Sequence, residues 1–274
     1  MNNIVAGIFS SIAFLILAGT GLSSSESDRD RLVLFIDFES IKAGDAGYEL
    51  ANEDRLEVVD GAGVHGGKAL LATFEGYERG SHRLTKRLPF GERGDEYTLN
   101  YDVRFSADFQ FVKGGKLHGL GPDKPITGGN AMRPDGWSAR VTFKEEGTIR
   151  SYLYCQNKDG KYGASVSNPR FQFKRERYYA VSLHVKLNSA PDSEDGFARI
   201  YVDGERLVDH QDVRFRESMG ETTLISQFMF SAFHGGHQPS WAPKNEDGSY
   251  ANVHAHFDNI AVYRRERVRM RVGK

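Results

Sequence analysis

The segment from Lys113 to Tyr154, KGGKLHGLGPDKPITGGNAMRPDGWSARVTFKEEGTIRSYLY, decides the fold. Two runs within it, WSARVTF at 137–143 and TIRSYLY at 148–154, alternate along the chain and are rich in β-branched and aromatic residues. Runs of this kind, bounded by turn residues, predict the strands of a sheet. Similar runs recur along the rest of the chain, at 32–38, 69–74, 97–105, 178–187, 197–202, 228–233 and 255–263.

These runs predict an all-β protein. No apolar 3.6-residue pattern persists beyond about two turns, so we expect few helices. Many short strands without βα alternation indicate a single-domain β-jelly roll or lectin-like β-sandwich. The sequence IYVDGERLV at 200–208 predicts a tight hairpin within it, with Asp203-Gly204 at the positive-φ positions of the turn.

The two strands of the opening segment should display polar side chains in pairs. Residues two apart in a strand point the same way, so Ser138 shares a face with Arg140, and Tyr152 shares a face with Tyr154. A double-glycine turn before them presents Lys116. If the strands are neighbours, one wall of the sheet carries cations beside two phenols, an arrangement suited to an acidic sugar.

The N-terminus predicts export. Residues 1–25 carry no charged side chain, and IVAGIFSSIAFLILAG is followed by small residues. We expect a signal peptide at 1–24, a mature domain at 25–274, and a secreted or periplasmic protein. The alternative is an uncleaved anchor, because the apolar run is nearly long enough to span a bilayer. After cleavage we expect no stable membrane association.

Charge and cysteine content exclude some classes. The formal net charge of −1 does not favour nucleic acid as a partner. The only cysteine, Cys155, has no partner for an intramolecular disulfide. It should face away from the tyrosine side of its strand and pack as core rather than act as a nucleophile.

The order and spacing of several short motifs resemble polysaccharide lyase family 14, which holds alginate lyases and glucuronan-cleaving enzymes. The motifs that carry the resemblance are Lys-Gly-Gly-Lys-Leu at 113–117, Trp-Ser-Ala-Arg at 137–140, Tyr-Leu-Tyr at 152–154, Phe-His-Gly-Gly at 233–236, Trp241 and Phe-Asp-Asn-Ile at 257–260. The chain departs from the family at His118-Gly119, where we expect Pro-Gly, and in the insert GPDKPITGGNAMRPDG. The insert should reshape one rim of the site.

The resemblance implies a secreted polysaccharide lyase that cleaves a polyuronate, alginate first, by β-elimination. The reaction needs a group that neutralises the C6 carboxylate, a base for H5 and an acid for the leaving O4. A tyrosine base, with an ordinary pKa of ~10, needs nearby cations to form a phenolate. By resemblance the catalytic residues are Lys116, Arg140, Tyr152 and Tyr154, with Tyr152 favoured for proton transfer, and Ser138 helps to hold the sugar acid. Beyond the resemblance, we expect His118, Lys113, His234 and Trp241 to bind substrate.

Each motif also has a purely structural interpretation. Tyr-x-Tyr in a strand is commonly cross-strand packing, and a lysine after two glycines is commonly a solvated turn. His118, two residues beyond Lys116, is a second candidate base if it shares that face. His234 and Trp241 form either a cleft edge with a sugar-stacking platform or an ordinary loop over the core.

We expect no cofactor and no metal. His254 and His256 alternate as zinc ligands can, but a third ligand is missing. A structural Ca²⁺ at Asp37, Glu39 and Asp258 is a weaker interpretation than solvated carboxylates. The basic tail 264–274 either binds a polyanion or, as we prefer, is a frayed and solvated terminus.

Two other function classes remain open. A non-catalytic carbohydrate-binding module or lectin would use the same basic face to hold an acidic glycan. A glycoside hydrolase needs paired catalytic carboxylates, but no closely spaced pair such as Glu-x-Asp-x-x-Glu occurs, and Glu145-Glu146 should lie at a turn. In every case we expect a monomer that binds an acidic polysaccharide.

Overall fold

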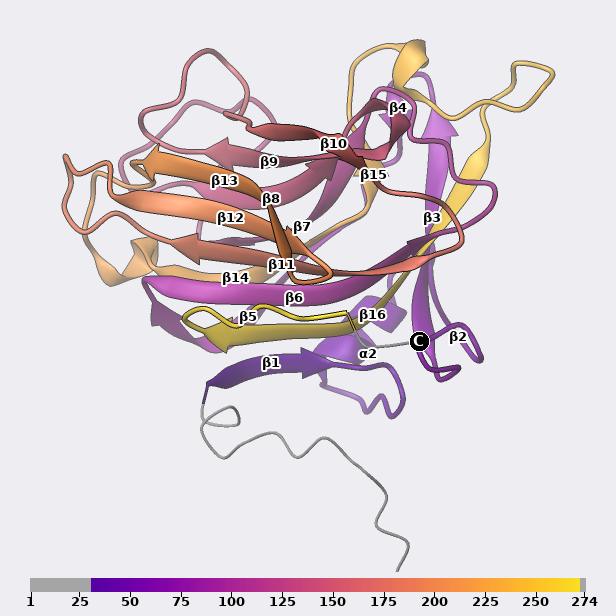
Figure 1. Ribbon diagram of the computed structural model, residues 1–274, viewed down its shortest axis with the longest axis horizontal. Helices are drawn as coiled ribbons and strands as arrows, with labels where there is room; N and C mark the ends of the chain where they lie inside the picture. The colour runs from indigo at the N-terminus through magenta and orange to yellow at the C-terminus, as the bar shows by residue number, and fades with distance from the viewer. Residues whose placement is uncertain (1–30, 272–274) are drawn as a thin grey trace, which may run out of the picture. The chain divides into compact units, whose positions relative to one another are not determined.

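Two antiparallel β-sheets stack face to face and enclose the apolar core (Figure 1). The computed structural model describes residues 31–271. The first sheet has the strand order β13-β12-β11-β6-β16-β3-β2, with β1 paired to β16 and β4 paired to β3. The second sheet has the order β10-β9-β8-β7-β14-β5, with β15 paired to β7. The fold is therefore a jelly-roll type of β-sandwich, as the sequence predicts.

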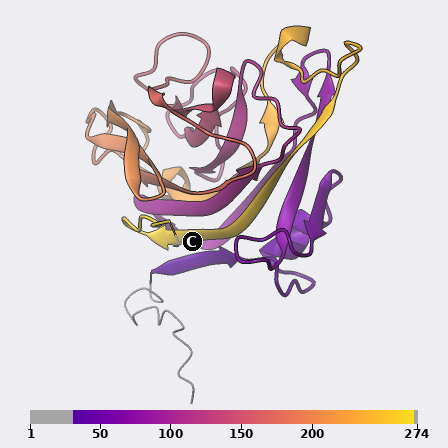
Figure 2. The same ribbon diagram turned by 45° about the vertical axis from the view of Figure 1, so that its right-hand side comes forward.

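Long strands form the middle of the first sheet, and β16 curves along it (Figure 2). Its strands are β1 Leu32–Ile36, β2 Leu56–Val59, β3 Ala69–Tyr77, β4 Gly80–Ser81, β6 Glu96–Phe105, β11 Tyr178–Lys186, β12 Gly196–Val202, β13 Glu205–Val213 and β16 Asn252–Arg264.

Shorter strands form the second sheet. They are β5 Thr85–Gly94, β7 Gly115–Gly121, β8 Ser138–Phe143, β9 Thr148–Tyr154, β10 Ser167–Gln172, β14 Ile225–Ser231 and β15 Phe233–His234. Helical structure is confined to α2 Ala46–Ala51 and to three short 3₁₀ turns, η1 Glu145–Gly147, η2 Glu221–Thr223 and η3 Pro239–Trp241. The expectation of few helices is confirmed in the described part of the chain.

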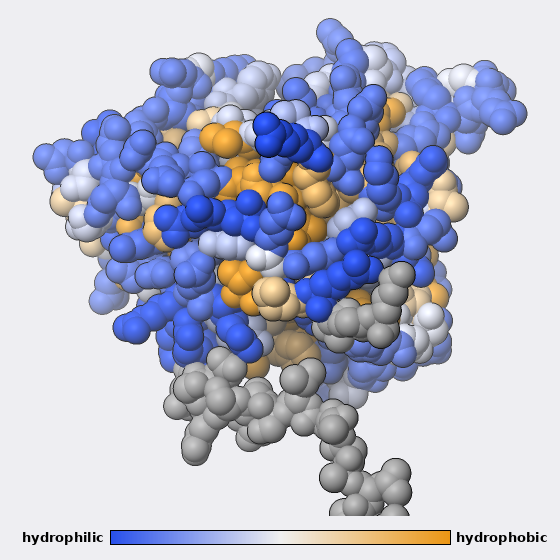
Figure 3. Space-filling view, in the orientation of Figure 1, coloured by the Kyte–Doolittle hydropathy of each residue, from blue (hydrophilic) through white to orange (hydrophobic). Residues whose placement is uncertain are grey.

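The core lies between the sheets and is rich in aromatic rings. Phe105, Phe109 and Phe143 pack within one aromatic cluster, with ring centroids 4.6–5.8 Å apart. Cys155 joins this core with 2% of its surface exposed, as predicted, and burial raises the pKa of its thiol to about 12. Figure 3 shows one face of the exterior, which is hydrophilic over most of its area.

Two of the predicted turns between strands are confirmed, and one is not. Asp203 and Gly204 have φ values of 52° and 89°, so the hairpin between β12 and β13 has the predicted turn. Glu145 and Glu146 lie in η1, between β8 and β9, as expected. The turn predicted to present Lys116 is wrong, because the turn at Val112-Lys113 ends at Gly114, which has a φ of 122°, and Gly115 already belongs to β7. Lys116 itself belongs to β7.

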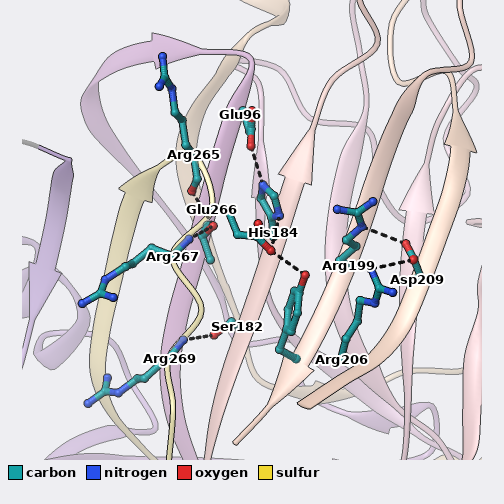
Figure 4. A network of polar contacts seen from close by, with 12 residues as sticks. Glu96, Ser182, His184, Arg199, Arg206, Asp209, Arg265, Glu266, Arg267 and Arg269 are labelled. Atoms are coloured by element: carbon teal, nitrogen blue, oxygen red, sulfur yellow. Dashed lines mark hydrogen bonds and ion pairs between the residues drawn. The ribbon is translucent and has the colours of Figure 1, made fainter. Parts of the chain in front are cut away.

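The basic tail lies along the first sheet as far as Arg269, so its interpretation as frayed is wrong for residues 264–269 (Figure 4). The backbone NH of Arg267 donates to Thr98 Oγ1 over 3.0 Å, and that of Arg269 donates to Ser182 Oγ over 2.9 Å. The Arg269 guanidinium lies 3.1 Å from Asp102. The tail thus covers polar side chains on the outer surface of the first sheet.

The predicted signal peptide at 1–24 lies outside the described residues. Among residues 31–271, no helix is long and apolar enough to cross a membrane.

Candidate functional site

Strand register brings the predicted residues onto one face of the second sheet. Ser138 pairs with Tyr154, and Arg140 pairs with Tyr152, across β8 and β9. Directly paired residues of antiparallel strands project to the same side. The alternating residues of these strands, such as Ala139 and Val141, enter the core instead. The polar residues therefore lie on the face that points away from the core, which we call the site face.

Three cations surround the ring of Tyr152 on the site face. The Lys116 Nζ lies 4.1 Å from the ring centroid, and the guanidinium carbons of Arg140 and Arg150 lie at 5.8 and 5.5 Å. They come from three neighbouring strands, since Lys116 is on β7, Arg140 on β8 and Arg150 on β9. Positive charge is thus concentrated around one phenol.

Among the residues that the structure describes, no carboxylate balances this charge. Neither Lys116, Arg140 nor Arg150 forms an ion pair within residues 31–271, and Arg150 Nε donates instead to Thr142 Oγ1 over 2.9 Å. The Nε of Arg140 is buried without a hydrogen-bond partner in the same range. A buried cation without a partner is costly. An anionic ligand on the site face would supply the missing counter-charge.

Burial and mutual repulsion shift the protonation of these cations. Burial lowers the pKa of Lys116 well below its usual range, and Arg140, Arg150 and Arg83 lower it further. Burial also lowers the pKa of Arg140 to about 10, against the opposing effect of Tyr152 and Tyr154. Lys116 is therefore the cation on this face that most readily releases its proton.

Tyr154 is held in place and stays protonated. Its hydroxyl oxygen accepts a hydrogen bond of 2.6 Å from the backbone NH of Gly129. Burial, followed by the neighbouring Tyr152 hydroxyl, raises the pKa of Tyr154 above its ordinary value. The two tyrosine rings meet edge to face with centroids 5.8 Å apart. Tyr154 therefore fixes one side of Tyr152.

The Ser138 side chain is hydrogen-bonded to the loop between β7 and β8. Its hydroxyl donates to the carbonyl of Ile126 over 2.7 Å, and Ile126 packs against Tyr152 and Tyr154. Ile126 belongs to the insert noted in the sequence, so part of the insert packs against the two tyrosines. Ser138 thus anchors that part of the insert in the free protein.

Gly119 makes room for Arg140. A Cβ at Gly119 would lie 2.4 Å from Arg140 Cγ and 2.1 Å from the carbonyl oxygen of Ala139. The arginine side chain therefore passes directly over the Gly119 backbone, one strand away from its own. A larger residue at this position would displace the guanidinium from the site face.

The prediction that His118 shares a face with Lys116 is wrong. The pairing of β7 with β8 shifts register between Lys116 and Gly119, and this irregularity turns His118 into the core. Its ring lies 4.4 Å from those of Phe230 and Phe257, measured between centroids, and none of its surface is exposed. Burial lowers its pKa to about 3. His118 is therefore a core residue that cannot contact substrate.

His234 is also a core residue rather than a cleft edge. Its ring lies 5.3 Å from that of Phe74 and 5.4 Å from that of Phe109. Its Nε2 lies 2.8 Å from the carbonyl oxygen of Gln110, and burial lowers its pKa to about 4. The prediction of a substrate-binding side chain here is wrong for the same reason as at His118, since strand β15 directs the ring inward.

The glycine turn after His234 does reach the site. A Cβ at Gly235 would lie 3.3 Å from Lys116 Nζ, and one at Gly236 would lie 2.1 Å from Trp241 Cγ. The half-buried Trp241 therefore packs directly on Gly236 of this turn, and Lys116 lies beside Gly235. Lys113 is exposed just before β7. The contribution of Trp241 and Lys113 to binding stays a prediction.

The sequence of the chain matches a family model. The model for polysaccharide lyase 14 matches residues 72–254, a span that holds every residue of the site described above. The chain belongs to polysaccharide lyase family 14. It is accordingly a polysaccharide lyase, and the alternative of a non-catalytic module is set aside. No curated protein matches this family 14 chain.

Solved structures share its fold. The alginate lyase Aly36B is 23% identical, with a TM-score of 0.66 over 85% of this chain and 98% of that one. The family 14 alginate lyase of Aplysia kurodai is 20% identical, with a TM-score of 0.67 over 85% and 99%. The endo-β-1,4-glucuronan lyase of Trichoderma reesei is 19% identical, with a TM-score of 0.52 over 76% and 86%.

The site of this family 14 protein contains cations that the motifs did not reveal. Arg150 lies two residues before Tyr152, so the strand alternation that pairs the tyrosines also places Arg150 beside them. Arg87 lies near the start of β5, and Arg83 lies in the segment just before that strand. The charges of both arginines lower the pKa of Arg140. No sequence motif marked that strand.

The described residues offer no metal centre. No group of three or more His, Cys, Asp or Glu within 31–271 could hold a metal ion. The carboxylates considered for Ca²⁺ accept backbone hydrogen bonds instead, Glu39 from Lys68 over 2.7 Å and Asp258 from Val64 over 3.0 Å.

Proposed function

We propose that this lyase cleaves an acidic polyuronate, with alginate as its first substrate, by β-elimination. The observation that carries the proposal is the cluster of Lys116, Arg140 and Arg150 around Tyr152 without an acidic counter-ion. Uronate carboxylates would supply that counter-charge. The complex of an Aly36B mutant with an alginate tetrasaccharide supports this choice of substrate, as does the fold shared with the family 14 alginate lyase of Aplysia kurodai.

The geometry supports a division of roles. Arg140 binds the C6 carboxylate through its guanidinium, which can do so bidentately, and thereby acidifies H5. Tyr152 transfers the proton. As H5 leaves C5, its electron pair forms the C4=C5 double bond, the C4–O4 bond breaks and O4 takes a proton. The products are one chain with an unsaturated uronate at its non-reducing end and a second chain with a new reducing end, and no water is consumed.

Lys116 and Tyr154 support that step. Lys116 has a lowered pKa in the free protein, and an anionic sugar next to it raises that pKa again. The lysine thus becomes the second cation on the substrate when the substrate is bound. Tyr154, held by Gly129 and protonated, keeps Tyr152 in position. The predicted leader supports a location of this reaction outside the cytoplasm, in the medium or the periplasm.

The test is the ultraviolet absorbance of unsaturated uronate with residues 25–274 on polymannuronate, polyguluronate and glucuronan, each with and without EDTA. We expect absorbance to grow on a mannuronate- or guluronate-containing polymer and to be insensitive to EDTA. Growth on glucuronan alone would make the chain a glucuronan lyase instead. No growth on any of the three would overturn the proposal.

A further inference from the structure

One cross-strand row links the catalytic residues to the far edge of the second sheet. Arg87 on β5 pairs with Met229 on β14, Met229 pairs with Gly119 on β7, and Gly119 pairs with Arg140. Tyr152 ends the row on β9. Directly paired residues share a face, so Arg87 projects to the site face. Four strand spacings separate it from Tyr152, which is about 19 Å of backbone.

The cations of β5 divide into two groups. On the other face of the strand, Lys86 forms ion pairs with Glu49 and Glu53 of the α2 region. Near its end, Arg93 lies 2.7 Å from Asp123. Exposed Arg87 on the site face has no such carboxylate partner among residues 31–271.

Arg83, in the segment before β5, resembles Arg87 in its exposure and in its lack of an acidic partner among the described residues. Its charge nevertheless depresses the pKa of both Lys116 and Arg140. The two arginines therefore extend the unbalanced positive field of the site along one direction, toward β5.

We propose that Arg83 and Arg87 bind carboxylates of the polymer at sugar units beyond the one that Arg140 holds. The anionic chain then lies across the strands, from Tyr152 on β9 to the β5 edge. The inference rests on the proposed function and deepens it, because it makes charge on successive sugars a determinant of affinity. The substrate class is a chain with uronates at consecutive positions rather than isolated acidic sugars.

The experiment compares Arg87→Ala and the double variant Arg83→Ala/Arg87→Ala with Arg206→Ala. Arg206 is an exposed arginine of the first sheet and forms a surface ion pair with Asp209. Its replacement by alanine removes one positive charge, as Arg87→Ala does, but away from the site face. Each variant is assayed on the polyuronate that the wild type cleaves and on its trisaccharide, at low and high salt.

For Arg87→Ala we expect the ratio of kcat/KM on polymer to kcat/KM on trisaccharide to fall ~fivefold, through a higher polymer KM. In the double variant this ratio should fall further, and the polymer KM should depend less on salt than it does in the wild type. Arg206→Ala should keep the wild-type ratio.

Two outcomes would overturn the inference. One is a ratio for Arg87→Ala equal to that of Arg206→Ala. The other is an equal loss on polymer and trisaccharide, which would place the arginines in the reaction centre. Both differ from a failure of the proposed function, in which the wild type itself forms no unsaturated product from any polyuronate.

Discussion

The ammonium nitrogen of Lys116 lies 4.1 Å from the centre of the Tyr152 ring, on a strand two removed from it. The intervening strand β8 contributes Arg140 to the same ring. The site is thus assembled across three strands rather than along one, and each of its properties depends on strand register. The following predictions test that arrangement.

Replacing the tyrosines separates proton transfer from positioning. Tyr152→Phe should lower kcat by ~10²–10⁴-fold, the range for loss of a general acid–base group. Tyr154→Phe should have a smaller effect, because that hydroxyl holds its neighbour, and the double variant should form no unsaturated product. The measurement is the initial rate of ultraviolet absorbance. Substantial activity in the double variant would remove both residues from the mechanism.

Substrate binding should take up a proton at Lys116. Burial and the arginines hold its pKa well below 10.5 in the free protein, and a bound carboxylate raises it. Between the free and bound pKa values, binding therefore protonates the amine. Calorimetry with the Tyr152→Phe/Tyr154→Phe variant and a uronate oligosaccharide, in buffers of different ionisation enthalpy, measures the uptake. Adding Lys116→Gln should abolish it; uptake that persists would belong to another group.

Gly119→Ala should damage both stability and binding. The added Cβ collides with the Ala139 carbonyl and with Arg140 Cγ, and overpacking of this kind costs about 1–3 kcal/mol of unfolding free energy. The displaced arginine should also raise KM. Gly220→Ala is the matched control, because a Cβ there meets only Ser218 Oγ at 3.9 Å. Its φ of −68° suits alanine. Thermal unfolding and KM of both variants check the prediction.

His118 should make the protein less stable in acid. Its folded pKa of about 3 lies below the ordinary 6.5, so the unfolded chain binds a proton that the folded protein excludes. Stability is therefore complete above pH 6.5 and falls as pH drops toward 3, by about 1.4 kcal/mol per pH unit. His118→Phe should flatten the dependence of the unfolding free energy on pH, measured in urea. Exposed His82→Gln should leave the slope unchanged.

Strand periodicity predicted most of the architecture. The predicted run at 148–154 coincides with β9, and the Asp203-Gly204 turn has the expected backbone. Strand β5 was missed because its sequence, TKRLPFGERG, contains a proline and two glycines that usually interrupt strands. Arg87 was therefore not predicted as part of the site, although Arg150 could have been placed there from the strand alternation alone.

Register irregularities set the limit of prediction for the histidines. A strict two-residue period puts His118 beside Lys116, whereas the shift between Lys116 and Gly119 puts it in the core. Such a shift depends on how two strands pair, and a single strand's pattern does not contain that information. His234 is misplaced similarly, because its strand has only two residues and no period to measure.

The place of β16 in the chain also governs when the fold can form. This strand, Asn252–Arg264, pairs with β1, β3 and β6, all of which lie before Ser106 in the sequence. Until β16 has been synthesised, these early strands lack the neighbour that joins them. The first sheet is therefore completed late, through pairing between strands far apart in the sequence.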